Sequence, residues 1–202
     1  MKGAHLAVEN VSHTYRRGRQ QAVADIDLEV KPGEALALVG RSGCGKSTTL
    51  RMASGFIDPD SGTVTVDGRS MADDRIGAQA RMGYLAEGAP LFLDLSARSF
   101  LSYVTRMHGI ASVDRAAAID RVAQSARIDD ILDRPLEALS KGYRRRVALA
   151  GAMIHDPPVL ILDEPTDGLD PNQKHEVRLM IRKMSAEKAI ILSTHILDEV
   201  DA

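Results

Sequence analysis

The chain has 202 residues, of which 44% are hydrophobic and 27% are charged, and its formal net charge at pH 7 is −2. This balance is typical of one soluble globular domain, and it argues against a wide nucleic-acid-binding face, which usually carries a basic excess. The single cysteine, Cys44, excludes an internal disulfide and favours a reducing compartment, so we expect a cytoplasmic protein.

Two stretches near the start of the chain alternate apolar and polar residues. In residues 5–15, Leu6 and Val8 are separated by polar or small neighbours, and residues 22–30 alternate in the same way. This two-residue period predicts half-exposed antiparallel strands. Residues 61–68 show β-branched alternation between glycine turns, which predicts an edge hairpin strand.

Three short apolar runs follow a different pattern. The first, residues 35–40, is almost wholly apolar, which is typical of a strand buried on both faces. Two further runs, residues 158–165 and 188–195, each follow a helical stretch. An alternation of strands and helices predicts a mainly parallel sheet with right-handed crossovers.

The middle of the chain is predicted to be helical. From residue 96 to about residue 133, apolar residues such as Phe100, Leu101 and Val104 recur at three- and four-residue spacing. We therefore expect an α/β fold in one domain. Its expected parts are an α/β core with an N-terminal antiparallel β layer, formed by residues 1–87 and 153–202, and an inserted α-helical subdomain, formed by residues 88–152.

A glycine-rich segment with the sequence GRSGCGKST occupies residues 40–48, directly after the first apolar run and before a helical stretch. It matches the phosphate-binding loop G-x-x-x-x-G-K-[ST] in the required strand–loop–helix context, so the sheet is predicted to be a P-loop NTPase core. Its glycines let backbone N–H groups at a helix N-terminus point at phosphate oxygens. We expect Lys46 to neutralise the β- and γ-phosphates of ATP, and Ser47 to give its hydroxyl to Mg²⁺. The nucleotide-binding residues expected here are Gly40, Arg41, Ser42, Gly43, Cys44, Gly45, Lys46, Ser47 and Thr48.

Acidic residues and a histidine follow the two later strands. Asp163 and Glu164 come at the carboxyl end of one strand, and His195 comes at the end of the next. Ligands of open parallel sheets bind at this edge. We therefore expect Asp163 to hold Mg²⁺ through water, Glu164 to polarise an attacking water, and His195 to sense the γ-phosphate.

Taken in order, these motifs resemble those of the ATP-binding subunits of ABC transporters. Residues 40–48 match the family's Walker A motif, and VLILDEP at 159–165 matches Walker B. The chain also has LSKGY at residues 139–143 for the signature, DGLD at 167–170 for the D-loop, and STH at 193–195 for the switch histidine. Tyr15 stands where the family has its adenine-stacking loop. The resemblance covers almost the whole chain and looks closest to the branch of multidrug-export, gliding-motility-type and copper-enzyme-maturation transporters.

The resemblance implies a composite site. In the family, two subunits pack head to tail, and the signature helix of one caps the γ-phosphate that the other holds. Ser140 and Gly142 are then expected to present a hydroxyl and backbone N–H groups to a nucleotide on a second copy or a similar subunit. Asp170 is expected to cap a helix and to lie at the dimer interface.

The resemblance also implies a membrane partner. No stretch approaches the roughly 18 apolar residues of a spanning helix, so we expect the chain to lie on the inner face of the cell membrane through a transmembrane permease subunit. Residues 89–95 offer apolar side chains for that contact. No nucleic-acid partner is expected, and the transported substrate leaves no trace in the sequence.

The signature departs from the family pattern. The family commonly has Gly-Gly-Gln after Leu-Ser, whereas here Lys141 and Tyr143 replace the first Gly and the Gln, and Gly142 is kept. Lys141 adds positive charge near the phosphates, which either tightens binding or slows closure. The altered signature permits an alternative function, a nucleotide-gated regulatory module with little turnover; another is a soluble ABC-type ATPase.

Three further features keep two interpretations each. Glu87 stands where the family often has Gln, which implies contact with Mg²⁺ or the attacking water, but it is also compatible with a solvated turn acid. Tyr15 either stacks on adenine or only packs. The basic residues 144–146 advance about 100° each on a helix, so they are interpreted as mostly solvated surface rather than a nucleic-acid stripe.

The amphipathic pattern after His195 stops without a closing Gly or Pro, so we expect a further C-terminal segment.

Overall fold

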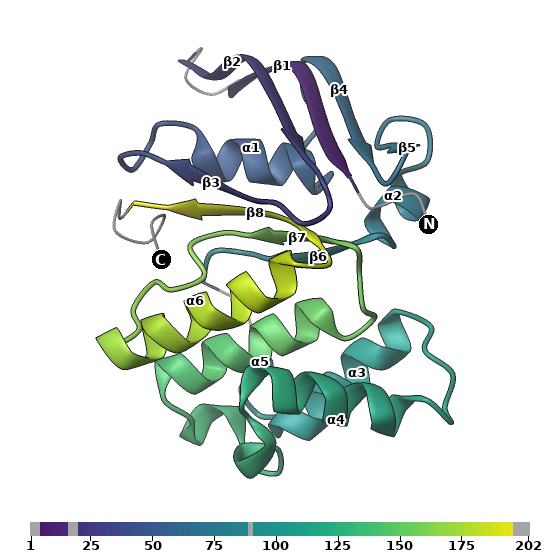
Figure 1. Ribbon diagram of the computed structural model, residues 1–202, viewed down its shortest axis with the longest axis vertical. Helices are drawn as coiled ribbons and strands as arrows, with labels where there is room; N and C mark the ends of the chain where they lie inside the picture. Colours follow the sequence, from purple (N-terminus) through teal and green to yellow (C-terminus); the bar gives the residue numbers. More distant parts are fainter. Residues whose placement is uncertain (1–4, 16–19, 89–90, 196–202) are drawn as a thin grey trace.

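The computed structural model describes residues 5–15, 20–88 and 91–195. These residues form two four-stranded sheets and a set of helices that stack in layers (Figure 1). The antiparallel sheet lies at one end of the molecule, helix α1 packs beneath it, the parallel sheet follows, and helices α3 to α6 cover the far side. The predicted α/β class, with a parallel sheet and an N-terminal antiparallel layer, is confirmed.

The antiparallel sheet contains β1 (Leu6–Tyr15), β2 (Gln20–Val30), β4 (Ser61–Val66) and β5 (Arg69–Ser70), in the order β2-β1-β4-β5. The alternating segments are therefore strands, as predicted. The hairpin prediction for residues 61–68 is also confirmed, because β4 turns directly into β5. The edge position was wrong: β4 pairs with β1 on one side and with the two-residue β5 on the other.

The second sheet is wholly parallel. It contains β3 (Ala35–Val39), β6 (Met82–Leu85), β7 (Val159–Leu162) and β8 (Ala189–Thr194), in the order β3-β8-β7-β6. Three of these strands match the predicted apolar runs, whereas β6 was not predicted. All four residues of β7 are buried, as expected for an inner strand of a parallel sheet.

The expectation that the first apolar run is buried on both faces was wrong. Ala35 and Val39 are exposed, and the three residues between them are half-buried. Within the described part of the chain, β3 pairs with β8 alone and so forms one edge of the parallel sheet. A continuous apolar run does not distinguish an edge strand from a central strand, because its neighbours come from distant sequence.

Two hydrophobic clusters, one on each face of the parallel sheet, explain why its central strands are apolar throughout. Val159 and Ile161 of β7 belong to a cluster with α1 and the antiparallel sheet. Their neighbours Leu160 and Leu162 belong to a cluster with α3 to α6. Successive side chains of a strand point to opposite faces, so one strand contributes to both cores.

The helices surround these cores. The first, α1, follows the glycine-rich loop, and the others except α2 lie on the far face of the parallel sheet (Figure 1). Within the described ranges, no helix has the length and apolar content needed to cross a bilayer. The helices are α1 (Lys46–Ala53), α2 (Arg75–Gln79), α3 (Ala97–Met107), α4 (Arg115–Ala126), α5 (Lys141–Met153) and α6 (Pro171–Ser185), and short 3₁₀ turns at Asp129–Ile131 and Leu136–Ala138 connect α4 to α5.

Side chains cap helices α5 and α6 on the far side, and the cap predicted at Asp170 is confirmed. Helix α5 begins after Ser140, whose side chain accepts a hydrogen bond from the Tyr143 amide at 3.3 Å. Helix α6 begins after Asp170, which accepts from the Gln173 amide at 2.9 Å, with proline in the first turn. Each cap satisfies an amide that has no partner inside its helix.

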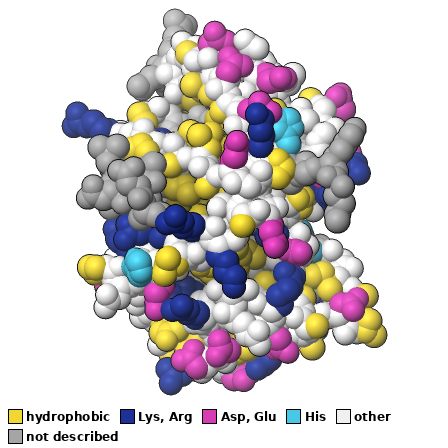
Figure 2. Space-filling view, in the orientation of Figure 1, with side chains coloured by type: hydrophobic (Ala, Val, Ile, Leu, Met, Phe, Trp, Pro, Cys, Tyr) yellow, Lys and Arg dark blue, Asp and Glu magenta, His cyan; other side chains and the backbone are white. Residues whose placement is uncertain are grey.

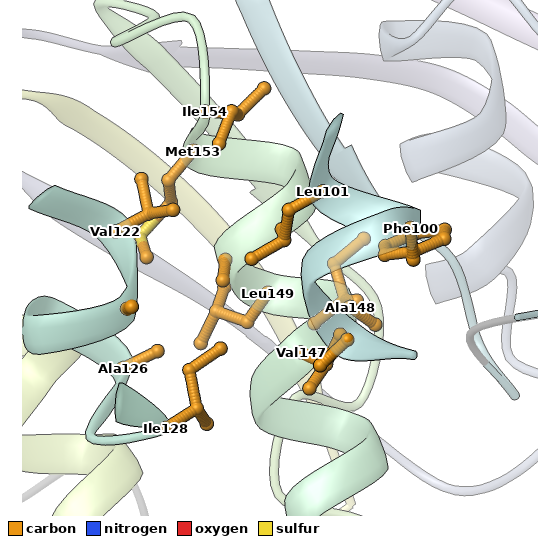
Figure 3. Packing of buried hydrophobic residues seen from close by; sticks show 14 of the residues in the cluster. Phe100, Leu101, Val122, Ala126, Ile128, Val147, Ala148, Leu149, Met153 and Ile154 are labelled. Atoms are coloured by element: carbon orange, nitrogen blue, oxygen red, sulfur yellow. The ribbon is translucent and has the colours of Figure 1, made fainter. Parts of the chain in front are cut away.

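Leu149 lies in the middle of the far-side cluster. Figure 3 shows it between Leu101 of α3 and Val122 of α4, with Ile128 close by. All four side chains are at most 1% exposed. Packing between α3, α4 and α5 therefore holds α5, and with it Ser140, against the parallel sheet.

Replacing Leu149 with Ala should lower the free energy of unfolding by about 2–5 kcal/mol, because the substitution leaves a cavity among α3, α4 and α5. Urea denaturation followed by circular dichroism measures the change. Leu179→Ala on α6 is the matched control, because Leu179 is 48% exposed and should cost about 1 kcal/mol or less. Equal losses in the two variants would contradict this account of the core.

Candidate functional site

A cleft of about 550 Å³ lies where β3, β7 and β8 end. Its lining comes from the end of β1, from β2, from the loop after β3, from the turn after β6 and from the ends of β7 and β8, so six separate segments meet there. This is the sheet edge at which the sequence predicted a ligand. The predicted site residues that line it are Tyr15, Ser42, Gly43, Gly45, Lys46, Ser47, Thr48, Glu87, Glu164 and His195.

The glycine-rich loop depends on backbone conformations that favour glycine. Gly43 and Gly45 have φ angles of 83° and 100°. A Cβ on Gly45 would lie 2.6 Å from the carbonyl oxygen of Ala22, so the loop packs tightly against β2. Helix α1 starts directly after Gly45. The loop therefore delivers the amides of the first turn of α1 to the cleft, as an anion site requires.

The side chain of Lys46 folds back into the loop. Its Nζ donates to the carbonyl oxygens of Gly40 at 2.7 Å and of Arg41 at 3.4 Å. It also lies 3.9 Å from Oε1 of Glu164, and the lysine side chain is only 9% exposed. Gly40 and Arg41 thus position the ammonium group rather than line the cleft. Cys44 is exposed and also lies outside the lining.

Asp163 is fully buried and joins three elements. Its Oδ1 accepts hydrogen bonds from Ser47 Oγ of α1 at 3.1 Å and from Ser193 Oγ of β8 at 2.6 Å. Its Oδ2 is buried without a hydrogen-bond partner in the described structure. A buried carboxylate oxygen without a donor is costly, so this atom and Ser47 Oγ fit the oxygen ligands of a magnesium ion.

Glu164 has its carboxylate between a cation and an imidazole. Oε2 lies 3.0 Å from Nδ1 of His195, and Oε1 faces Lys46. The Glu164 side chain is 15% exposed and that of His195 is 53% exposed. The backbone of Glu164 has a φ angle of 48°, and its amide donates to Ser193 Oγ at 2.9 Å. A positive φ is unfavourable for a non-glycine residue and is maintained here by surrounding contacts.

Tyr15 lines the cleft at its open side. Its ring is 41% exposed, and its hydroxyl lies 3.3 Å from Thr48 Oγ1 of α1. His13 packs edge-to-face against the ring, with 4.8 Å between the centroids. These two contacts orient the ring while leaving a substantial part of it open to a flat ligand. Glu87, in the turn after β6, is exposed and lines the same cleft.

The predicted signature residues lie apart from this cleft. Ser140 is exposed at the start of α5. Gly142 is buried, and an added Cβ would meet the side-chain amide of Gln173 on α6. Lys141, expected to add charge near phosphates, lies 3.3 Å from Oδ2 of Asp167 in the same chain. The structure therefore brings the Walker residues together and leaves Ser140, Gly142 and Asp170 outside the cleft lining.

The interpretation of the basic run as solvated surface was wrong for two of its three residues. Arg145 and Arg146 are only 7% and 9% exposed. Arg146 forms an ion pair with Glu176 of α6, whereas Arg145 reaches backbone carbonyls beside the cleft. Helix α5 is packed on several sides, so residues 100° apart find different buried partners. On the face in Figure 2, Lys and Arg side chains are interspersed with Asp and Glu.

Sequence reasoning missed Ser193 and Arg145. Ser193 is fully buried, and its hydroxyl joins the Glu164 amide to the Asp163 carboxylate. A polar residue near the end of an apolar strand was the available signal, but the segment was interpreted only for its histidine. Arg145 had no comparable signal, because its partners are backbone groups.

The chain is similar to known proteins over most of its length. A family model described as ABC transporter matches residues 23–167. The chain is 37% identical to Nod factor export ATP-binding protein I of Cupriavidus metallidurans and 35% identical to the ABC transporter ATP-binding protein NatA of Bacillus subtilis. These matches cover 98% and 90% of this chain, and 65% and 75% of the relatives.

The fold matches solved structures as well. CbiO1 from Clostridium perfringens, described as part of the ABC transporter complex cbiONQ, superposes with a TM-score of 0.85 at 30% identity. The match covers 96% of this chain and 80% of CbiO1.

Ser193→Ala should lower the free energy of unfolding by about 1–3 kcal/mol, because it removes a donor to the buried Asp163 and the acceptor of the Glu164 amide. Urea denaturation measures the loss. Ser185→Ala is the control, since the Ser185 hydroxyl donates to the carbonyl of Arg182 in its own exposed helix end. A Ser193 variant as stable as the control would show that this hydroxyl does not stabilise the site.

Proposed function

The chain belongs to the ABC transporter family, and from this premise we propose that it binds ATP, closes on it as a head-to-tail dimer and hydrolyses it to drive a membrane permease. The observation that carries the proposal is the meeting of Lys46, Asp163, Glu164 and His195 with the glycine-rich loop at one sheet edge. The glycine-rich loop and Asp163 are more than a hundred residues apart in the sequence, so it is the fold that brings these two motifs into contact.

Nucleotide binding follows from the loop and from Tyr15. The cleft volume of about 550 Å³ lies within the range of small-molecule sites. The amides after Gly45 and the Lys46 ammonium suit the phosphates, and the exposed Tyr15 ring suits a base. Lys46 lines the cleft and is held by carbonyls of its own loop, so its charge stays beside the amides that follow Gly45.

The residues present also fit Mg²⁺. Ser47 Oγ is a proposed ligand, Asp163 Oδ2, which has no hydrogen-bond partner among the described residues, is proposed to hold the ion through water, and Glu87 lines the same cleft as a further carboxylate. When bound, the ion supplies positive charge to the phosphate oxygens. Few protein ligands are needed, because Mg²⁺ in such sites keeps water and phosphate ligands.

Glu164 is the proposed group that polarises the attacking water. Its carboxylate is an acceptor held in the cleft by Lys46 on one side and His195 on the other. His195 is more exposed than Glu164, and we propose that it contacts the γ-phosphate. Catalysis of this kind depends mainly on positioning and charge, which these contacts provide.

The proposed dimer follows from the placement of the signature. Ser140 is exposed at the N-terminus of α5 and does not line the cleft of its own chain. A helix N-terminus suits an anion, and because Ser140 lies outside the cleft lining of its own chain, we propose that it serves a nucleotide held by a second copy or a similar subunit. In this arrangement Asp170, at the start of α6, lies near the contact.

The proposed permease contact lies in an apolar groove of about 430 Å³ between the edge strand β6 and helices α3 and α5. Phe56 lines it and is 74% exposed; Phe92 and Tyr103 pack edge-to-face nearby and are 52% and 43% exposed. In the predicted docking segment 89–95, residues 89 and 90 lie outside the described residues. CbiO1 is described as part of a transporter complex, which supports such a partner here.

This arrangement would place the chain on the cytoplasmic face of the membrane. We further propose that residues 88–152 act as the helical subdomain within a single ATP-binding domain, because α3 to α5 pack on one face of the sheet, and α3 and α5 border the groove. The transporter branch stays a prediction, and the helical pattern expected after His195 lies outside the described residues.

Glu164→Gln should trap an ATP-bound dimer, because it retains the shape of the site while removing the acceptor charge that polarises water. Light scattering coupled to size exclusion, with saturating Mg²⁺ and ATP, should show a doubled mass. Adding Lys46→Ala in the same chain is the control, and it should return the protein to monomer. A monomer in the single variant at saturating ATP would contradict the composite site.

Turnover distinguishes the enzyme from the regulatory alternative. Wild-type protein should release phosphate from ATP, and Glu164→Gln should slow this by about a hundredfold or more. If wild-type protein dimerises on ATP but releases no phosphate, the nucleotide-gated regulatory module is the correct function.

A photo-crosslinking amino acid at position 92 should form an adduct with the permease in native host membranes, because Phe92 is exposed and directly follows Leu91, which lines the proposed groove. Mass spectrometry identifies the captured protein, which should contain membrane-spanning helices. The same amino acid at Leu179, with a similar exposure of 48% against 52%, is the control. Permease adducts from position 179 but not from position 92 would place the contact elsewhere.

A further inference from the structure

Arg145 connects helix α5 to the turn that carries Glu164. Its guanidinium group lies in a nearly buried position and contacts the chain just after β6 and just after β7. We propose that Arg145 is a positioning residue that holds Glu164 for hydrolysis and couples it to the signature end of α5. This inference rests on the proposed ATPase function.

The guanidinium donates to four backbone carbonyls. Nε bonds Pro165 O at 3.3 Å, and Nη1 bonds Ala86 O at 3.1 Å. Nη2 bonds Asp163 O at 2.5 Å and Glu164 O at 2.6 Å. Three of the acceptors are consecutive residues. The planar guanidinium group has N–H donors on three nitrogens and can bond all four carbonyls. The ammonium group of lysine has its donors on one nitrogen and cannot span the same four acceptors.

These carbonyls need such a donor because the chain leaves the sheet here. After Leu162, the backbone turns through Glu164 at a φ of 48°. The carbonyls of Asp163 and Glu164 then point toward α5 instead of a neighbouring strand, and a buried carbonyl without a partner is costly. Arg145 satisfies the Asp163 carbonyl and gives a second donor to the Glu164 carbonyl, which also accepts from the Asp167 amide, and so stabilises the left-handed conformation that directs the Glu164 carboxylate into the cleft.

The charge of Arg145 suits this place. Burial lowers the pKa of its guanidinium, while the carboxylates of Asp167, Asp163, Glu164 and Glu87 raise it. Because arginine titrates far above neutral pH, the group stays charged at physiological pH. The carboxylate of Glu164 therefore lies near two positive charges, those of Arg145 and Lys46.

Because Arg145 lies on the same helix as Ser140, its contact with the Glu164 turn also connects that turn to the signature. Ser140 caps this helix, and Arg145 follows about one turn later. In the proposed dimer, the start of α5 faces the partner's nucleotide, whereas Arg145 reaches the turn of Glu164 in its own chain. A displacement of α5 would therefore move the Glu164 turn and Ala86, which directly precedes Glu87. One helix thus links both nucleotide sites of the dimer.

Arg145→Gln and Arg145→Lys test the inference in the full-length protein. Both should lower kcat for ATP hydrolysis, glutamine by about tenfold to a hundredfold and lysine by less, because a misplaced Glu164 slows the chemical step. The Kd for a fluorescent ATP analogue should change by no more than about twofold, because the loop and Lys46 are untouched. Arg121→Gln is the control: Arg121 also donates to a backbone carbonyl, Ile154 O at 2.8 Å, away from the cleft.

Hydrogen exchange gives a readout that needs no turnover. The Asp167 amide donates to Glu164 O at 3.1 Å, so exchange over residues 163–167 should accelerate in Arg145→Gln and stay unchanged in Arg121→Gln. Wild-type kcat in Arg145→Gln, or a parallel loss of kcat and nucleotide affinity with unchanged exchange at residues 163–167, would overturn the inference. Absence of hydrolysis by wild-type protein would overturn the proposed ATPase function instead, and the exchange experiment would still decide whether Arg145 holds the turn.

Discussion

The whole site depends on the parallel pairing of β3, β8 and β7, which places the carboxyl ends of these three strands side by side. In the registers of the sheet, Val39 of β3 lies beside Thr194 of β8, and Leu162 of β7 lies beside Leu192. The segments that leave these strands therefore start within hydrogen-bond reach of one another. The contact between Ser47 and Asp163 joins residues 116 positions apart, and it exists because the sheet aligns the ends of their strands.

The sequence was most informative where a local pattern and a local structure coincide. The glycine-rich loop needs residues that adopt a left-handed backbone and a helix that follows. Residues 40–48 contain both the glycines and the start of the helix, so a local motif predicts the local structure. β7 is apolar throughout because it is covered on both faces, and the carboxylates follow it directly. By contrast, β6 has four residues, and its Gly83 weakens any strand pattern. That glycine allows close packing, since a Cβ would lie 2.1 Å from Ala152 O of α5.

The wrong and missed predictions share one physical cause, which is that the partners come from distant sequence. The edge position of β3 depends on the order of strands, which periodicity does not contain. Arg145 and Arg146 were interpreted as solvated because consecutive helical residues diverge by about 100°. That divergence instead sends one guanidinium to the turn after β7 and the next to Glu176 on α6. A helix that is packed on several sides can bury charges that a surface helix would expose.

The signature end of α5 is held in place by packing and by Arg145 more than by its exposed ion pair. Lys141 and Asp167 have side chains that are 66% and 56% exposed, and solvent-exposed pairs contribute about 0–1 kcal/mol. Arg145, by contrast, satisfies buried carbonyls that would be costly without a donor. Because this residue shares α5 with Ser140, the direction of the helix start and the conformation of the Glu164 turn are set by the same rigid element. In the proposed dimer, a change in nucleotide contact at the start of α5 would therefore reach Glu164 through the hydrogen bonds of Arg145.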